Sequence, residues 1–223
     1  MAPTLFSRWP VMKALRNRIR RILPVVSGHR QLTMPVLETK RLVLRKFEQN
    51  DLGDIIRWEE ISNARNPKME AQKFLDYSFG EYRGGGAGPW GMQLKESGEM
   101  VGNCGFPHII FEELCGEVNY YVDPRHRRQG LALEAVKALL KFGFQEIGLT
   151  RIQGRCEPVN FGSERVMQKA GMKFEGFIEH APFSNDPSPK QKLYAISRNE
   201  FGPPANDVDD CATNMTAQSD GQG

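Results

Sequence analysis

Apolar and polar side chains alternate in the middle of the chain, along residues 117–122. A period of two predicts a β-strand with one buried side, here the side of Val118, Tyr120 and Val122. Pro124 ends this strand, because proline lacks the N–H that a sheet hydrogen bond needs. The pattern therefore predicts one strand near the centre of the sequence.

The same kind of pattern predicts the other elements. Helical spacing after Leu131 predicts a long helix that Gly148 ends, since glycine commonly closes helices. Shorter helices are predicted to begin near Asn50 and Asn160 and to cover residues 70–79. Further strands are predicted at residues 38–47, 90–94, 100–106, 151–156, 172–178 and 192–196. This mixture predicts a single domain of the α+β (mixed α/β) class.

Two glycines interrupt the predicted strand at residues 100–106. Gly102 and Gly105 offer no side chain to pack, so they weaken a strand unless the backbone needs the space. They indicate either a close approach of two backbones or a β-bulge.

Charge divides the chain into three parts. The net charge is +3, but residues 1–37 carry seven basic and no acidic side chains, and residues 202–223 carry four aspartates and no basic one. The segment between them is balanced, so the overall charge says little about what a folded domain binds. We predict a basic arm at residues 1–36, a folded domain at residues 37–201 and a disordered acidic tail at residues 202–223.

The basic arm has three open interpretations. Between Pro10 and Pro24 its apolar side chains follow helical spacing, and basic side chains fill the other faces. Such a helix is typical of an organelle transit peptide or a membrane-surface anchor. Its charge also suits contact with RNA. Because Met34 stands directly before the predicted domain, residues 1–33 can equally be upstream sequence read from a non-native start.

Composition fits a cytoplasmic globular protein. Apolar residues make up 39% of the chain and charged residues 26%, and no apolar run approaches the roughly 18 residues of a membrane span. The four cysteines lack the spacing of a zinc site or a disulfide framework. We therefore expect no metal and no membrane partner. The expected location is cytoplasmic, or organellar if the arm is a transit peptide.

A short basic loop joins the central strand to the long helix. Four of the five residues between Pro124 and Gly130 are basic. A helix N-terminus adds free N–H groups and a positive dipole end, which both favour an anion. The loop therefore predicts a diphosphate site, without the Gly-Lys-Ser/Thr of a P-loop. Its candidate binding residues are Arg127, Arg128, Gln129, Gly130, Leu131 and Ala132.

Several motifs, in one order, resemble the GNAT superfamily of N-acetyltransferases and its RimJ/RimL-type branch. Arg127-x-x-Gly130-x-Ala132 is similar to the acetyl-CoA diphosphate loop of that superfamily. The segments that resemble the branch are residues 37–45, 116–122, 160–172 and 193–195. The resemblance covers residues 37–201. It implies one GNAT-like domain, with a mostly antiparallel twisted sheet of about six or seven strands flanked by about four helices.

The resemblance also implies an activity and its partners. It implies an acetyl-CoA-dependent N-acetyltransferase, with acetyl-CoA as cosubstrate and a primary amine as acceptor. The acceptor is either a protein N-terminus, such as that of a ribosomal protein, or a small amine, and residues 181–190 are expected to shape its pocket. Nucleic acid is not an expected partner. Two other hypotheses stay open: an acyl-CoA-binding module without catalysis, and a ribosome- or RNA-associated protein that uses the basic arm.

Catalytic roles follow from the resemblance. Glu117 matches the carboxylate that withdraws a proton from the amine, with a purely structural strand glutamate as the alternative. Ser163 matches the serine that gives the thiolate its proton, unless it only caps a helix. Tyr194 is the alternative proton donor, unless it belongs only to the core. The histidines that could titrate near neutral pH are His108, His126 and His180.

Cosubstrate-binding roles follow in the same way. The backbone near Tyr121 and Val122 is expected to meet the thioester oxygen and the pantetheine arm. Asn160 is expected to hydrogen-bond that arm, to cap a helix, or to do both. Arg128 departs from the family pattern, which has a small residue there, so it either contacts phosphate or points outward.

Overall fold

The computed structural model describes residues 34–84, 86, 88–178 and 190–202. The strands are β1 (Leu37–Glu38), β2 (Leu42–Arg45), β3 (Trp90–Leu94), β4 (Met100–Ile110), β5 (Cys115–Val122), β6 (Arg151–Cys156), β7 (Lys173–Ile178) and β8 (Gln191–Ser197). The helices are α2 (Leu52–Ile61), α3 (Pro67–Arg83), α4 (Leu131–Phe142), α5 (Phe161–Lys169) and α6 (Arg198–Phe201). Nearly all of the predicted arm, tail and acceptor segment lies outside the described residues.

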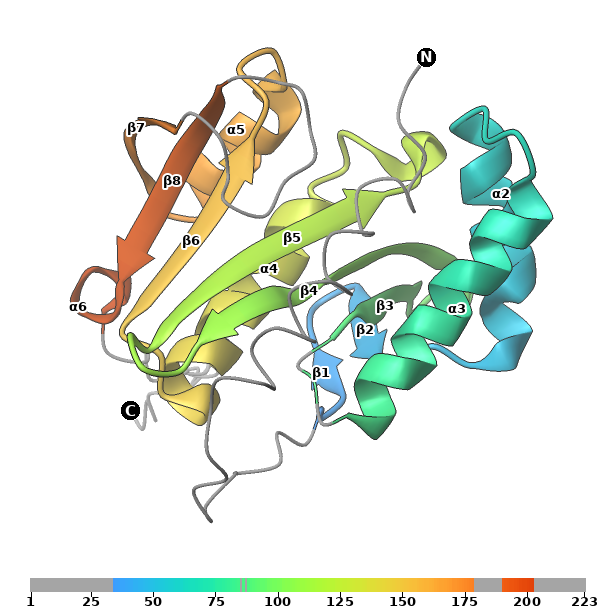
Figure 1. Ribbon diagram of the computed structural model, residues 1–223, viewed down its shortest axis with the longest axis horizontal. Helices are drawn as coiled ribbons and strands as arrows, with labels where there is room; N and C mark the ends of the chain where they lie inside the picture. Colours follow the sequence, from blue (N-terminus) through green and yellow to red (C-terminus); the bar gives the residue numbers. More distant parts are fainter. Residues whose placement is uncertain (1–33, 85, 87, 179–189, 203–223) are drawn as a thin grey trace, which may run out of the picture.

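The described strands form one sheet of eight, in the order β1-β2-β3-β4-β5-β6-β8-β7 (Figure 1). Neighbouring strands are antiparallel throughout, except that β5 and β6 run parallel. Parallel neighbours need a crossover connection, and α4 provides it. The one parallel pair therefore lies in the interior of an antiparallel sheet.

Helices cover both faces of the sheet (Figure 1). On the face of α2 and α3, the ring centroids of Trp58 and Tyr121 lie 5.9 Å apart. On the opposite face, α4 and α5 pack on the sheet, and Val118, Val122 and Leu140 belong to one buried cluster. The side chains of β5 thus alternate between two cores, as the period of two predicted.

The predicted class is confirmed, since the fold is α+β with a mostly antiparallel sheet. The predicted number of strands is too low, because the single strand predicted at residues 38–47 is a pair. Thr39 turns the chain between β1 and β2, where its N–H donates to the carbonyl oxygen of Leu42 at 3.0 Å. β1 then pairs with β2, with Leu37 opposite Leu44.

The long predicted helix has two parts. α4 is followed by a π-helical turn, Gly143–Ile147. Gly148 ends this turn with a φ of +91°, a left-handed conformation that glycine adopts without strain. The predicted end of the helix is therefore confirmed.

Both predictions about the glycines of β4 are confirmed. A Cβ on Gly102 would lie 2.2 Å from the carbonyl oxygen of Tyr121, so β4 and β5 approach too closely there for any side chain. Between Gly105 and His108 the register of β4 against β5 shifts. Beyond this bulge, His108 lies opposite Glu117. The irregularity thus sets which side chains share a face with Glu117.

None of the helices in the described ranges is long and apolar enough to cross a bilayer. Cys104, Cys115 and Cys156 are described, and all three are free thiols in buried positions.

Candidate functional site

The strands β5 and β6 pair along only part of their length. The pairs are Cys115 with Arg151, Gly116 with Ile152 and Glu117 with Gln153. Both strands continue, to Val122 and Cys156, but among the described residues they form no further pairs, and they diverge (Figure 1). We call this divergence the wedge. Along its β5 edge, alternate backbone N–H and C=O groups have no sheet partner.

The basic loop and the start of α4 follow directly on the end of β5. Gly130 precedes the helix with a φ of +82°, and Arg128 is also left-handed, with a φ of +63°. The first N–H groups of any helix, here those of Leu131 and Ala132, have no carbonyl partner within the helix. The exposed loop residues are Arg125, Arg127, Arg128, Gln129 and Gly130. This end of the wedge therefore offers N–H donors and positive charge to an anion.

The side chain of Arg127 folds back onto β5. Its Nε donates to the carbonyl oxygen of Val122 at 3.0 Å, and its guanidinium carbon lies 5.7 Å from the centre of the Tyr121 ring. The Tyr121 ring packs toward α2, so its backbone is the part that can line the wedge. The structure brings these three predicted binding residues together. The side chain of Arg127 holds the strand end rather than extending from the loop.

A clamp of hydrogen bonds joins the β1–β2 turn to the first turn of α4. Oε1 of Glu134 accepts from the Thr39 hydroxyl and from the Arg41 N–H, both at 2.6 Å. Oε2 accepts from Nε of Arg41 at 2.8 Å. Nη1 of Arg41 also donates to the carbonyl oxygen of Gln129 at 2.9 Å. We call Thr39, Arg41 and Glu134 the Glu134 clamp; it fixes the loop and the helix start as one unit.

The clamp also sets the charge of Glu134. Burial acts to raise the pKa of this carboxyl, but hydrogen bonds from Thr39 and Arg41 outweigh burial and hold the pKa below its usual value. Glu134 is therefore ionised at neutral pH, and it lies in the first turn of α4, where a negative charge is favourable.

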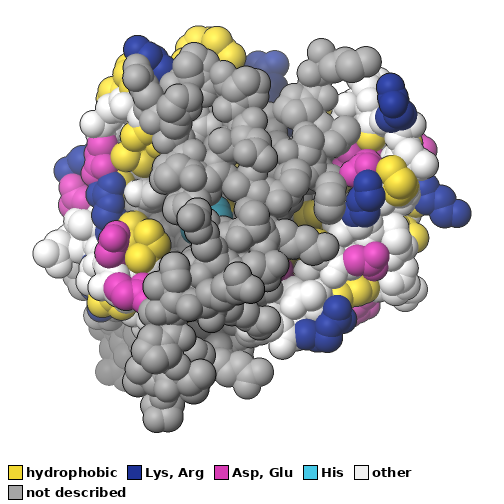
Figure 2. Space-filling view, in the orientation of Figure 1, with side chains coloured by type: hydrophobic (Ala, Val, Ile, Leu, Met, Phe, Trp, Pro, Cys, Tyr) yellow, Lys and Arg dark blue, Asp and Glu magenta, His cyan; other side chains and the backbone are white. Residues whose placement is uncertain are grey.

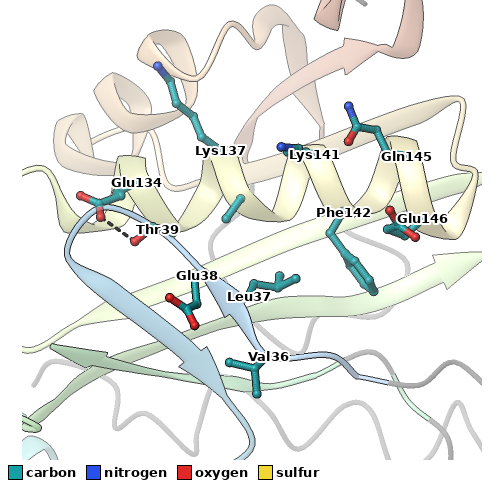
Figure 3. Close-up of a pocket in the computed structure, with 11 residues that line it drawn as sticks. Val36, Leu37, Glu38, Thr39, Glu134, Lys137, Lys141, Phe142, Gln145 and Glu146 are labelled. Carbon is teal, nitrogen blue, oxygen red and sulfur yellow. Dashed lines mark hydrogen bonds between the residues drawn. The ribbon is translucent and has the colours of Figure 1, made fainter. Parts of the chain in front are cut away.

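A groove lies beside the clamp, between β1 and α4 (Figure 3). Its volume is 450 Å³. Apolar side chains line it at Leu37 and Phe142, and charged ones at Glu38, Lys137 and Lys141. It contains no predicted catalytic residue and none of the wedge. The groove shares Thr39 and Glu134 with the clamp, and it lies outside the wedge.

On the other side of the wedge, Asn160 caps α5. Its Oδ1 accepts a hydrogen bond from the N–H of Ser163 at 3.0 Å. The hydroxyl of Tyr120 donates to the carbonyl oxygen of Ser163 at 3.0 Å, so β5 is joined to the first turn of α5. Ser163 is half-buried there. The predicted capping role of Asn160 is thus observed, and its amide N–H₂ group stays available as a donor.

Tyr194 is 2% exposed and belongs to a chain of polar side chains that joins β8 to α5. Its hydroxyl donates to Oε1 of Glu164 at 2.6 Å, and Oε2 of Glu164 accepts from Nζ of Lys192 at 2.8 Å. Burial and the Glu164 carboxylate raise the pKa of Tyr194 to about 12. The hydroxyl is therefore protonated at neutral pH, but it already donates to a carboxylate.

Glu117 faces the opposite side of the sheet, in an ion pair with Arg155 of β6. Its Oε1 accepts from Nε of Arg155 at 2.9 Å and from Nη2 at 2.6 Å. Nε2 of Gln153 lies 3.4 Å from its Oε2. His108 of β4 stands opposite Glu117. We call His108, Glu117, Gln153 and Arg155 the polar cluster; it lies at the last paired rung of β5 and β6, where the wedge begins.

A second ionic cluster borders the loop. Ligand atoms of Glu99, Asp123 and His126 lie within 4.8 Å of one another, a grouping that could hold a metal ion. Arg125 lies among them, with Nη2 3.0 Å from Glu99 and Nε 3.0 Å from Oδ2 of Asp123. The guanidinium thus provides the positive charge, and the cluster ties the loop to the β3–β4 turn.

The predicted site residues lie around β5 and β6, on both faces of the sheet. The loop residues follow the end of β5, and Glu117 lies on the face of α2 and α3. On the opposite face, Asn160 and Ser163 lie at the start of α5, and Tyr194 lies in β8. Sequence reasoning missed Arg155. Its one signal was a charged residue inside a predicted strand, on the same side of that strand as Gln153.

Sequence reasoning also missed residues that position the site. Arg41 and Glu134 are 93 positions apart, and only the fold shows that they meet. Tyr120 was assigned to a buried side, and no sequence pattern showed that its hydroxyl reaches Ser163.

Comparison with known proteins is consistent with this geometry. Residues 41–173 match a family described as the acetyltransferase (GNAT) domain. The chain is 30% identical over 176 residues to the uncharacterised N-acetyltransferase YnaD of Bacillus subtilis (strain 168), covering 74% of this chain and 98% of that protein. A crystal structure of a GNAT-family acetyltransferase from Bacillus anthracis is 28% identical, with a TM-score of 0.62 over 74% of this chain and 99% of that one.

A second solved structure is similar in fold. It is RimL, a ribosomal alpha-N-protein acetyltransferase, in complex with coenzyme A. Its identity to this chain is 18%, with a TM-score of 0.62 over 73% of this chain and 98% of that one. The likeness extends along nearly the whole length of both solved proteins.

Proposed function

Because the chain belongs to the GNAT family of acetyltransferases, we propose that it transfers an acetyl group from acetyl-CoA to a primary amine. The observation that carries this proposal is the wedge between β5 and β6, with the start of α4 at its mouth. A diphosphate suits the free N–H groups and dipole of the helix start. The amides of a pantetheine arm suit the unpaired backbone edge of β5. The coenzyme A bound by RimL supports the same cosubstrate here.

The proposal gives each side of the wedge a binding role. Backbone N–H groups of residues 130–132 and the side chain of Arg128 hold the diphosphate. The backbone at Tyr121 and Val122 meets the thioester and the arm. Asn160 binds the arm through its amide N–H₂ group, because its Oδ1 is already used by the helix cap.

Acetyl-CoA supplies the acetyl group as a thioester: its C–S bond breaks, an amide bond forms with the acceptor nitrogen, and coenzyme A leaves as a thiol. The chain supplies proximity and a backbone donor for the carbonyl oxygen. It also supplies two proton transfers on opposite faces of the sheet. The ammonium loses one proton on the Glu117 face. On the α5 face Ser163 gives a proton to the sulfur, and it regains one as the nitrogen releases its second proton during amide formation. Tyr194 is the alternative donor.

Turnover of a defined set of amines tests the proposal. The purified chain is mixed with acetyl-CoA and one amine at a time. The amines are peptides that begin with serine, alanine or methionine, Nα-acetyl-lysine, and a small diamine. Release of free thiol is measured against a control without amine. We expect at least one amine to be acetylated. Tight coenzyme A binding without turnover on any amine would instead favour a binding module without catalysis.

The class of acceptor is decided by a second measurement. Cell extract is incubated with the protein and isotopically labelled acetyl-CoA, and the products are identified by mass spectrometry. RimL is described as acting on protein α-amino groups, so a protein N-terminus is the acceptor that we propose first. Label in small amines alone would exclude that acceptor and leave the acetyl transfer itself intact.

A further inference from the structure

The polar cluster contains a histidine that faces the same side of the sheet as Glu117. After the bulge of β4, His108 is the direct partner of Glu117 across the strand pair. Residues directly opposite in an antiparallel pair project to the same face. This is the face on which α2 and α3 lie, and Figure 2 views the molecule from that face, in the orientation of Figure 1. His108 is half-buried there.

Glu117 is not free to act alone. Both of its oxygens face the Arg155 guanidinium, and the side chains of the pair are 15% and 14% exposed. A carboxylate in such a bidentate pair would lose charge-assisted hydrogen bonds on taking a proton. The pair also orders the cluster, because Glu117 comes from β5 and Arg155 from β6. The Glu117–Arg155 pair is therefore placed to support a neighbouring general base.

The surroundings of His108 keep its imidazole neutral. Burial, the largest effect, lowers its pKa; the Glu117 carboxylate acts to raise the pKa, and the Arg155 guanidinium acts to lower it. These are the charged groups that face His108 from β5 and β6. A histidine whose pKa lies below its ordinary value of about 6.5 is mostly neutral at neutral pH, and the neutral ring is the form that can accept a proton.

We propose that His108 is the group that takes the proton from the acceptor ammonium, with Glu117 and Arg155 as positioning residues. This assignment deepens the proposed function and rests on it. The N–H bond of the ammonium breaks, its electron pair stays on nitrogen for attack on the acetyl carbon, and the proton becomes the second N–H of the imidazole. Solvent then takes that proton, so no other reactant is needed. The base acts on one face of the wedge and Ser163 on the other.

The pH profile of kcat tests the assignment, because kcat reports groups of the enzyme–substrate complex. The acceptor is the fastest peptide of the amine set above. In the wild type, kcat should fall as pH drops through the His108 titration, below about pH 6.5. His108→Gln should lower the maximum kcat, the plateau of the pH profile, by about 100-fold. It should also remove the fall in kcat at acidic pH, which is the acidic limb of the profile. The loss should shrink above about pH 8, where a peptide α-amino group is already deprotonated.

Two neutralising variants give opposite shifts that a structural role would not produce. Glu117→Gln removes the charge that raises the His108 pKa, so the limb should move to lower pH. Arg155→Gln removes the charge that lowers it, so the limb should move to higher pH. The matched control is His126→Gln in the loop, which should keep the limb in place. An unchanged limb and plateau in His108→Gln would overturn the assignment.

If a variant fails to fold, a pH titration of His108 in the wild-type protein tests the assignment without measuring turnover. Wild-type protein with isotope-labelled histidine is followed by NMR as pH is varied. The His108 signal should be that of a neutral ring at pH 7, and its midpoint should shift oppositely in the Glu117→Gln and Arg155→Gln proteins. A charged ring at pH 7 would contradict the inference. If the wild type acetylates no amine, the proposed function fails instead, and the two failures are therefore distinguishable.

Discussion

Glu134 accepts hydrogen bonds from the β1–β2 turn while it stands in the first turn of α4. Glu134→Gln should therefore weaken coenzyme A binding by about tenfold, or ~1.4 kcal/mol, because the loop loses its anchor. The free energy of unfolding should fall by about 1–3 kcal/mol. Calorimetric titration with coenzyme A and thermal denaturation measure the two effects. The matched control is Glu146→Gln on exposed helical surface, and an equal loss there would contradict the clamp's role.

The same residue gives stability a defined pH dependence. The folded pKa of Glu134 is depressed, so its contribution is fully present above its unfolded pKa of about 4.3 and is lost as pH falls through the lower, folded value. The difference in Tm between the wild type and Glu134→Gln should accordingly be present at pH 7 and shrink in acid below about pH 4. A difference that grew on acidification would contradict this sign.

Ser163 and Tyr194 are separable as proton donors. The Tyr194 hydroxyl donates to Glu164, whereas Ser163 lies in the first turn of α5, which the Tyr120 hydroxyl joins to β5. Ser163→Ala should lower kcat by about 100-fold with little change in KM for acetyl-CoA, and Tyr194→Phe should lower it by about tenfold or less. Steady-state thiol release measures both. The reverse order of losses would make Tyr194 the donor.

At the scale of elements, the pairing of β4 with β5 requires glycine at residue 102, because no side chain fits there. A Cβ at residue 102 would overlap the Tyr121 carbonyl oxygen, so Gly102→Ala should destabilise the fold by about 3 kcal/mol or more. Gly80→Ala is the matched control in α3, where a Cβ meets nothing within 4 Å. It should stabilise by about 0.5–1 kcal/mol, because alanine favours a helix interior. Urea unfolding distinguishes these opposite signs.

The helices and strands were largely predictable because each has one dominant period. Val118 and Val122 alternate with polar residues, and their burial follows. The β1–β2 pair was not predictable from period alone. Its turn depends on hydrogen bonds of Thr39, which also reaches Glu134 in a distant helix. Local pattern carries no information about such a long-range partner.

At the scale of the molecule, the described fold begins with a contact of its first residues. The carbonyl oxygen of Pro35 accepts from Nε1 of the buried Trp90 at 2.9 Å. A protein shortened to residues 34–202 should keep the Tm and the coenzyme A affinity of the full chain. One that starts at Leu37 should lose about 1–3 kcal/mol, because the indole N–H is left buried without its partner. Thermal denaturation and calorimetric titration with coenzyme A measure the two effects. Equal stability of the two shortened proteins would contradict a stabilising role for the contact between Pro35 and Trp90.

The site was predictable where its residues are close in sequence and not where the sheet brings them together. The loop and the helix start form one segment, so their spacing alone indicated a diphosphate site. The polar cluster depends on register. His108 meets Glu117 only because of a bulge, and Arg155 meets Glu117 only because β6 returns parallel to β5. The sequence indicated Glu117 and a titratable His108, but it did not show that His108 and Arg155 are the partners of Glu117.

The parallel pair inside an antiparallel sheet also has a consequence for amide hydrogen exchange. Central strands usually hold the slowest-exchanging amides of a protein. Here every second amide of residues 118–122 faces the wedge and lacks a carbonyl in β6. The middle of the sheet should therefore exchange in an alternating pattern of slow and fast amides. Bound coenzyme A would slow the fast set selectively, so the cosubstrate would complete a sheet that the chain alone leaves open.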